Sequence, residues 1–195
     1  MRRSDYYEAR GLDRITGLSD GVFAFSLTLL SMELIVPQLS GSGTSLLFQD
    51  LLDEYSRFVV FLLTFIITGA YWSLHHRIFR FIRGYDGILM RLNLFSLFFI
   101  ILMPFITKLI NQYGDTRVAV IVAAAGYAAP GLLLGFTWHY ASTGHRFIDP
   151  AIPAGFVRLT TLKNYISPSV FLISIPVAFI GPKYALLFWL LLFPL

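Results

Sequence analysis

Long apolar runs, separated by short polar segments, constrain this chain more than any other feature of its sequence. A helix that crosses the hydrocarbon core of a bilayer requires roughly 20 consecutive apolar residues, and the 195 residues contain several runs near that length. Only 13% of the residues are charged, whereas a soluble domain carries roughly a quarter. The runs are continuous rather than alternating, which excludes a β-barrel. We therefore expect an all-α integral membrane protein.

The runs predict six transmembrane helices in a single transmembrane domain that covers residues 1–195. The predicted spans are residues 18–36, 56–76, 89–110, 117–139, 162–180 and 183–195. The last run offers only about 12 apolar residues, so we expect the sixth span to be truncated. The segment LLFQDLLDEYSRF, between the first two spans, is predicted to form a short amphipathic helix. Four prolines fall inside the runs and predict kinks in the helices: Pro104, Pro130, Pro168 and Pro176.

The basic residues favour one side of the membrane. Eleven of the 15 Lys and Arg residues fall on the side that holds both termini: Arg2, Arg3, Arg10, Arg14, Arg77, Arg80, Arg83, Arg91, Arg146, Arg158 and Lys163. The opposite side holds Arg57, Lys108, Arg117 and Lys183. Because positively charged loops remain in the cytoplasm, both termini are predicted to be cytoplasmic.

The residues that carry catalysis are absent or poorly spaced. The chain has no cysteine, which excludes disulfides, thiolate metal sites and cysteine nucleophiles. His75 and His76 are adjacent, so on a regular helix they point about 100° apart and cannot chelate one ion together. No Ser-His-Asp order, phosphate-binding glycine loop or pair of carboxylates stands out. We therefore expect no enzyme, no catalytic residue and no cofactor. We also expect no nucleic-acid partner and no small-molecule substrate.

Polar residues gather at the cytoplasmic end of the first three spans. Ionisable groups near or within a membrane span are costly, so each is expected to have a functional role and a specific bonding partner. Arg14 and Asp20 are six residues apart, about 120° from facing each other on a helix, so each is expected to bond to a neighbouring helix. The candidate network comprises Arg14, Ser19, Asp20, Trp72, His75, His76 and Asn93. Two interpretations stay open: a structural network that fixes helix packing, and a proton or ion relay.

The first span has two distinct faces on a helical wheel. One face carries Gly21, Phe25, Thr28, Leu29 and Met32. The opposite face carries Ser19, Phe23, Ser26, Leu30 and Glu33. Small and hydroxyl residues allow close helix approach and cross-helix hydrogen bonds, so the second face suits packing. The first face is suited either to lipid or to a lumen, in which apolar rings would exclude water and a hydroxyl ring would replace part of an ion's hydration.

The stretch Arg14-x-x-x-Leu18-Ser19-Asp20 resembles the RxxxFSD signature of the transmembrane protein 175 potassium channels. The likeness continues through FAFSLTLLSMEL, YWSLHHRIF and LNLFSLFFIILMPFITKL, and it covers roughly the first 110 residues. The Trp-x-x-His-His run, one span after the signature, makes the combined pattern specific. The resemblance implies a prokaryotic channel subunit with six spans in the plasma membrane.

The resemblance also implies an assembly and residue roles. The subunits would form a homotetramer in the lipid bilayer, with a central pore lined by the first helix and K⁺ as the permeant ion. Phe25, Leu29 and Met32 match the family's apolar constriction, and Thr28 matches its selectivity-linked threonine. The signature residues are similar to a family network that ties the first helix to the second.

Two positions depart from the family pattern. Leu18 replaces the signature phenylalanine, a mild change at a packing position. Phe25 stands where the family usually has Ile or Leu, so four phenyl rings would either narrow the pore or rotate aside as a gate. The alternative function is a secondary transporter or proton-coupled carrier. Transporters place charged or broken-helix sites at the midplane, whereas these ionisable residues lie toward the cytoplasmic end, which favours a potassium-preferring channel.

Overall fold

A computed structural model describes residues 3–34 and 54–189 of the chain. Its elements, in chain order, are α1 Arg3–Leu30, η1 Ser31–Glu33, α3 Tyr55–Phe79, α4 Gly87–Ile101, α5 Met103–Tyr113, α6 Arg117–Ser142, η2 Thr143–His145, α7 Ala154–Ile180 and α8 Pro182–Trp189. Within the described residues, 5 helical segments are long and apolar enough to cross a membrane. The all-helical membrane fold expected from the apolar runs is confirmed.

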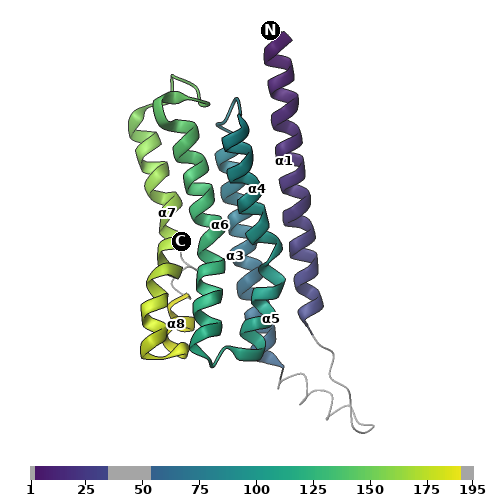
Figure 1. The fold of residues 1–195 in the computed structure, drawn as a ribbon, viewed down its shortest axis with the longest axis vertical. Helices are drawn as coiled ribbons and strands as arrows, with labels where there is room; N and C mark the ends of the chain where they lie inside the picture. Colours follow the sequence, from purple (N-terminus) through teal and green to yellow (C-terminus); the bar gives the residue numbers. More distant parts are fainter. Residues whose placement is uncertain (1–2, 35–53, 190–195) are drawn as a thin grey trace.

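The long helices run alternately up and down, and α1 stands at one edge of the subunit (Figure 1). α1 packs against α3, α4 and α5, while α6 packs against α4, α5 and α7. The start of α1, the α3–α4 connection and the α6–α7 connection lie at the same end (Figure 1). This is the end to which the sequence assigns most of the basic residues.

The ends of the chain differ from the predicted spans. α1 begins at Arg3, well before the predicted start at residue 18, so the first helix extends past the bilayer-length run. α8 accounts for the first part of the predicted span 183–195, and residues 190–195 lie outside the described residues. The predicted amphipathic helix also lies outside them, except for its last residues, which begin α3.

The predicted third span is two helices joined at Leu102, because Pro104 lies in the first turn of α5. Proline has no N–H to donate to the carbonyl four residues earlier, and its ring crowds that carbonyl. The other three prolines lie inside continuous helices, one in α6 and two in α7. Gly87–Tyr113 still forms one segment long enough to cross a membrane, so the interruption beside Pro104 is the kink that the sequence predicts.

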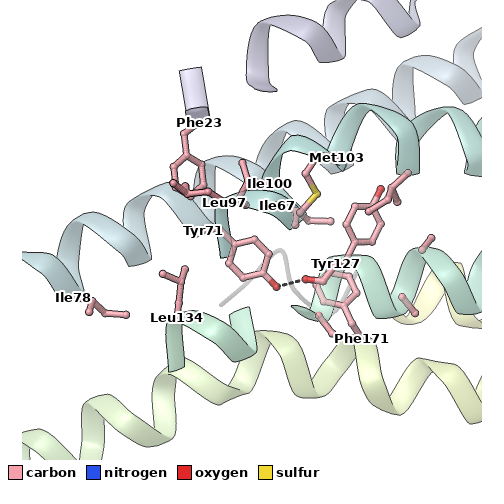
Figure 2. Packing of buried hydrophobic residues seen from close by; sticks show 14 of the residues in the cluster. Phe23, Ile67, Tyr71, Ile78, Leu97, Ile100, Met103, Tyr127, Leu134 and Phe171 are labelled. Atoms are coloured by element: carbon pink, nitrogen blue, oxygen red, sulfur yellow. Dashed lines mark hydrogen bonds between the residues drawn. The ribbon is translucent and has the colours of Figure 1, made fainter. Parts of the chain in front are cut away.

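The centre of the subunit is packed around α6, where small residues let neighbouring helices approach. Gly131 of α6 lies where α3 and α7 converge: a Cβ added there would lie 2.8 Å from Tyr71 and 3.1 Å from Pro168. The Tyr71 hydroxyl donates to the carbonyl oxygen of Tyr127 at 2.7 Å, the bond drawn in Figure 2. Any side chain at Gly131 would therefore displace the ring that joins α3 to α6.

The connections at the basic end are also tied together. Asp86 caps α4 by accepting from the N–H groups of Ile88 and Leu89, at 3.0 and 2.9 Å. Its other oxygen accepts from the Tyr140 hydroxyl of α6 at 2.6 Å. The bond from Tyr140 favours the charged carboxylate most, and with the capping bonds it lowers the pKa of Asp86. Arg83 and Asp149 add an ion pair of 2.8 Å between the two connections.

Candidate functional site

One face of α1 is buried against its own subunit. The buried residues recur at helical spacing: Ile15, Ser19, Phe23, Ser26 and Leu30. Phe23 and Leu30 are 1% and 0% exposed, and α3, α4 and α5 cover this stripe. Spacings of three and four residues place side chains on one side of a helix. The rotation of α1 about its axis is therefore set by this packing.

The opposite face of α1 points away from the rest of its subunit. Phe25 is 62% exposed and Met32 is 75% exposed, Gly21 and Thr28 are exposed as well, and Leu29 is partly buried. This is the face that the helical wheel separates but cannot assign to lipid or lumen. The single subunit leaves it uncovered, along the helix that forms the edge of the bundle (Figure 1).

Thr28 is the one hydroxyl residue on the exposed face. Its hydroxyl donates to the carbonyl oxygen of Phe25, three residues earlier, at 2.8 Å. The proton is thus directed along the helix, and the lone pairs of Oγ1 remain free to face outward. A hydroxyl oriented in this way presents its oxygen atom, rather than its proton, to the outward side.

A buried chain of hydrogen bonds joins α1, α3 and α4. His75 Nε2 lies 3.0 Å from Asn93 Oδ1, which only accepts, so the ring donates. Asn93 Nδ2 donates to Ser19 Oγ at 3.0 Å, and the Ser19 hydroxyl donates to the Ile15 carbonyl oxygen at 2.8 Å. All three side chains are at most 1% exposed. The ring of His75 stacks on Phe79 with centroids 4.2 Å apart, which fixes its orientation.

A second contact between α1 and α3 lies on the exposed side of this chain. Trp72 Nε1 donates to Asp20 Oδ1 at 2.9 Å. The ring of Trp72 also lies 6.0 Å from the ring of His76. His76 itself is exposed and forms no hydrogen bond with the other network candidates in the part of the chain that the structure describes.

Arg14 lies apart from these contacts. Its side chain is exposed, and it forms no ion pair with Asp20 among the described residues. It lines a recess between α1 and α4, together with Leu18, Tyr85 and Asn93. The structure thus brings together Ser19, Asn93 and His75, and separately Asp20 and Trp72, while Arg14 and His76 stay outside both groups.

Sequence reasoning missed a third polar cluster, at the junction of α3, α5 and α6. Thr107 donates to Thr64 Oγ1 at 2.9 Å, and the hydroxyls of Thr64 and Tyr127 lie 2.7 Å apart. All three residues are 0% exposed. Thr64 and Thr68 are four residues apart on an apolar helix, and that spacing was the available signal. The cluster joins three helices through buried side chains, so it serves the packing of the subunit.

The described residues contain no group of three or more His, Cys, Asp or Glu side chains that could hold a metal ion. The chemistry that the described surface of α1 does offer is an outward row of apolar side chains with one hydroxyl among them. Such a row repels water and offers weak oxygen contacts to an ion.

Comparisons with known proteins agree on one family. A family model described as endosomal/lysosomal potassium channel TMEM175 matches residues 14–104. A potassium channel of Streptomyces collinus is 31% identical over 173 residues, which cover 86% of this chain and 82% of that protein. A potassium channel of Chamaesiphon minutus is also 31% identical, over 86% of this chain and 84% of that protein.

A solved structure has the same fold as this chain. It is the crystal structure of a lysosomal potassium-selective channel TMEM175 homolog from Chamaesiphon minutus. The two share 28% sequence identity with a TM-score of 0.81, and the match covers 94% of each chain. The likeness therefore extends beyond residue 104, where the family model ends, to most of the helices that follow.

Proposed function

The chain belongs to the TMEM175 potassium channel family, and from this premise we propose that it conducts potassium passively through a homotetramer in the membrane. The two prokaryotic relatives described above are potassium channels and not enzymes, and potassium is the permeant ion. The whole of residues 1–195 would form one channel domain. The tetramer, the pore face and the residue roles below are parts of the proposal.

The main structural support for this proposal is the uncovered face of α1. A single subunit has α1 at its edge, and the residues that project outward are Phe25, Thr28 and Met32. Four copies arranged around an axis would place these side chains in a central conduit. The buried stripe on the other side of α1 supports this rotation, because Phe23 and Ser26 already pack against the same subunit.

Within that conduit the apolar side chains and the hydroxyl would have different roles. Phe25, Leu29 and Met32 recur at spacings of four and three residues, so each would form one apolar ring of four side chains. A narrow apolar ring gates by excluding water. Thr28 would add a ring of four hydroxyls, with each proton directed at the Phe25 carbonyl. Oxygen atoms presented in this way replace part of the hydration shell of potassium.

The chain from His75 to Ser19 serves as a structural network rather than a proton relay in this proposal. Its last hydrogen bond goes from Ser19 to the carbonyl of Ile15, and a carbonyl oxygen has no proton to pass on. Its polar groups are buried and paired, which suits a role in holding α1 at a fixed rotation. The Trp72–Asp20 bond would add to this attachment.

The orientation follows from charge. The end of the subunit that carries the α3–α4 and α6–α7 connections (Figure 1) is the end to which the sequence assigns most of the basic residues. The positive-inside rule places such an end in the cytoplasm. We accordingly place both termini in the cytoplasm and the channel in the plasma membrane of a prokaryote.

Reconstitution of the purified protein in planar bilayers tests the proposal. Unitary current steps carried by potassium, without a partner ion or proton gradient, are expected. Saturable flux that requires a co-transported ion would instead indicate the secondary transporter or proton-coupled carrier, which the potassium channel relatives do not favour. A detergent-solubilised particle with a mass other than four subunits would contradict the tetramer.

A further inference from the structure

A groove of about 430 Å³ runs between α3 and α7, on a part of the subunit away from α1. α6 packs closely against α7, and Tyr71 and Pro168 converge on Gly131 of α6, so α6 holds the two flanking helices together at this depth. The walls are mainly apolar and include Ile66 and Ala70 of α3. The size is in the range of ligand sites in proteins.

Two cations stand at one end of this groove. Arg77 lies in the last turn of α3, and Lys163 is on α7. Tyr71 and Pro168 lie at a similar depth in the membrane, since both approach Gly131. Arg77 lies six residues beyond Tyr71 toward the cytoplasmic end, and Lys163 lies five residues from Pro168 in the same direction. At a helical rise of 1.5 Å per residue, both cations therefore lie about 8–9 Å closer to the cytoplasmic end than Tyr71 and Pro168.

Neither cation has an acidic partner in the described part of the chain. The ion pairs there join Arg57 to Glu54 and Arg83 to Asp149, and none of the described residues that line the groove is Asp or Glu. Both side chains are exposed. A charge within a span is costly unless it is paired or reaches the headgroup region.

The surface around Lys163 has the composition of a lipid-facing surface. Leu162 is 60% exposed and Ile166 is 43% exposed on α7, and Ile66 is 40% exposed on α3. Ser73 and Ser167 add hydroxyls to the groove lining near the cations. One occupant matches this arrangement: a molecule with an anionic head at the cytoplasmic surface and an apolar tail along the groove.

We propose that the groove between α3 and α7 is a binding site for an anionic phospholipid of the cytoplasmic leaflet. Arg77 and Lys163 bind the phosphate, with hydroxyl contacts from Ser73, and an acyl chain lies along Ile66 and Ala70. Basic pockets between helices on the cytoplasmic side recognise anionic lipid headgroups by the same chemistry. The site is distinct from the ion pathway along α1.

Native mass spectrometry of the full-length protein in detergent tests the site. Phosphatidylglycerol and phosphatidylcholine with identical acyl chains are titrated separately, and inorganic phosphate is added as a competitor. The protein is expected to retain phosphatidylglycerol at lower lipid concentration. Removal of each cation should reduce that preference roughly fivefold, the factor expected for one basic residue near anionic lipid. Equal retention of the two lipids, or displacement by equimolar inorganic phosphate, would overturn the assignment.

Two matched double variants test whether the preference for phosphatidylglycerol depends on the cations of the groove. R77Q/K163Q should lose the preference for phosphatidylglycerol, whereas R91Q/R158Q removes two exposed cytoplasmic-side charges outside the groove and should keep it. A loss of the same size in both variants would indicate a general charge effect and contradict the site. Ala70→Phe fills the apolar part and should weaken retention of both lipids.

A second copy of the subunit is the competing occupant, and the lack of cysteine makes it testable. Single Ala70→Cys and Ile166→Cys variants have no background thiol. Protection of these thiols from maleimide by phosphatidylglycerol, but not by phosphatidylcholine, supports the lipid site. Oxidative cross-linking between subunits through either position would show a protein interface there and overturn the proposal. Both readouts are independent of ion conduction, so they distinguish failure of this site from failure of the channel function.

Discussion

The hydroxyl of Ser26 on α1 donates a hydrogen bond of 2.7 Å to the carbonyl oxygen of Ile100 on α4. Ile100 is the residue whose carbonyl would accept from position 104 in an unbroken helix, and position 104 is a proline. In lipid, a carbonyl freed by proline must find a partner on a neighbouring helix. Ser26 supplies that partner, which couples the break between α4 and α5 to the position of the first helix.

Ser26→Ala should therefore lower the free energy of unfolding by about 1–2 kcal/mol, because it leaves the buried Ile100 carbonyl without this donor. In a Pro104→Ala background the helix regains an N–H at position 104, so the same change should cost less. A double-mutant cycle, measured by denaturant unfolding in detergent micelles, gives the difference. Ser31→Ala is the control, since that hydroxyl is exposed and donates to the carbonyl oxygen of Thr28, only three residues earlier. An identical Ser26→Ala penalty in both backgrounds would refute the coupling.

Asn93 is the residue on which the buried network depends most. Asn93→Ala removes a partner of both His75 and Ser19. It should cost about 2–3 kcal/mol, because the buried His75 ring loses its hydrogen bond and Ser19 keeps only the bond to the Ile15 carbonyl. Trp72→Phe removes one bond at an exposed position and should cost about 1 kcal/mol or less. Thermal unfolding of the two purified variants compares these losses. A smaller effect for Asn93→Ala than for Trp72→Phe would argue against the network as the main attachment of α1.

Thr28→Val should reduce the preference for potassium over sodium, because it removes the hydroxyl and keeps the shape of the side chain. A change of about 1 kcal/mol between the two ions corresponds to roughly fivefold in the permeability ratio. Thr28→Ser keeps the hydroxyl and serves as the matched control. Reversal potentials under mixed-ion conditions measure the ratio. If Thr28→Val leaves the reversal potential unchanged, Thr28 has no role in selectivity.

Phe25 and Phe23 form a matched pair, because they are two residues apart and their exposures are 62% and 1%. Phe25→Ala should raise single-channel conductance by widening an apolar ring, with little loss of stability in the subunit. Phe23→Ala should instead destabilise the bundle by about 3 kcal/mol, since it leaves a cavity in a packed core. Single-channel recording and thermal unfolding separate the two effects. Unaltered conductance in both Phe25→Ala and Leu29→Ala would count against the apolar gate.

Asp86 provides a pH-dependent contribution outside the membrane spans. Its pKa is lowered in the folded protein, chiefly by the hydrogen bond from Tyr140, relative to about 3.9 in an unfolded chain. The unfolded state therefore binds the proton more readily. The stabilisation is fully present above pH 4–5 and is lost as the pH falls through the lowered pKa.

Asp86→Asn should accordingly reduce the unfolding temperature at pH 6 and have a smaller effect near pH 3. Thermal unfolding in detergent across this range checks the prediction. Asp115→Asn, in the connection before α6, removes a carboxylate from the opposite end of the bundle as a control. A difference between wild type and Asp86→Asn that grows toward low pH would contradict the assigned direction.

Much of the candidate site could be predicted from the sequence because it lies on a single helix. The residues that the helical wheel assigns to packing include Ser19, Phe23, Ser26 and Leu30, and all four are buried. The network was harder to predict. Arg14 and His76 were expected to join it, yet the structure leaves both outside its hydrogen bonds, while Ser19, Asn93 and His75 meet at the centre.

The sequence by itself determined that this chain is a bundle of membrane helices, which ends of those helices are basic, and which face of the first helix packs. These properties follow from hydropathy and the helical period, both of which are local. The tertiary structure alone decided that Ser26 meets the Ile100 carbonyl, that Thr64, Thr107 and Tyr127 share one cluster, and that α3 and α7 enclose a groove. Such contacts depend on the relative depth and rotation of helices that are far apart in the chain, and these are set by side-chain packing between helices rather than by any period along one of them.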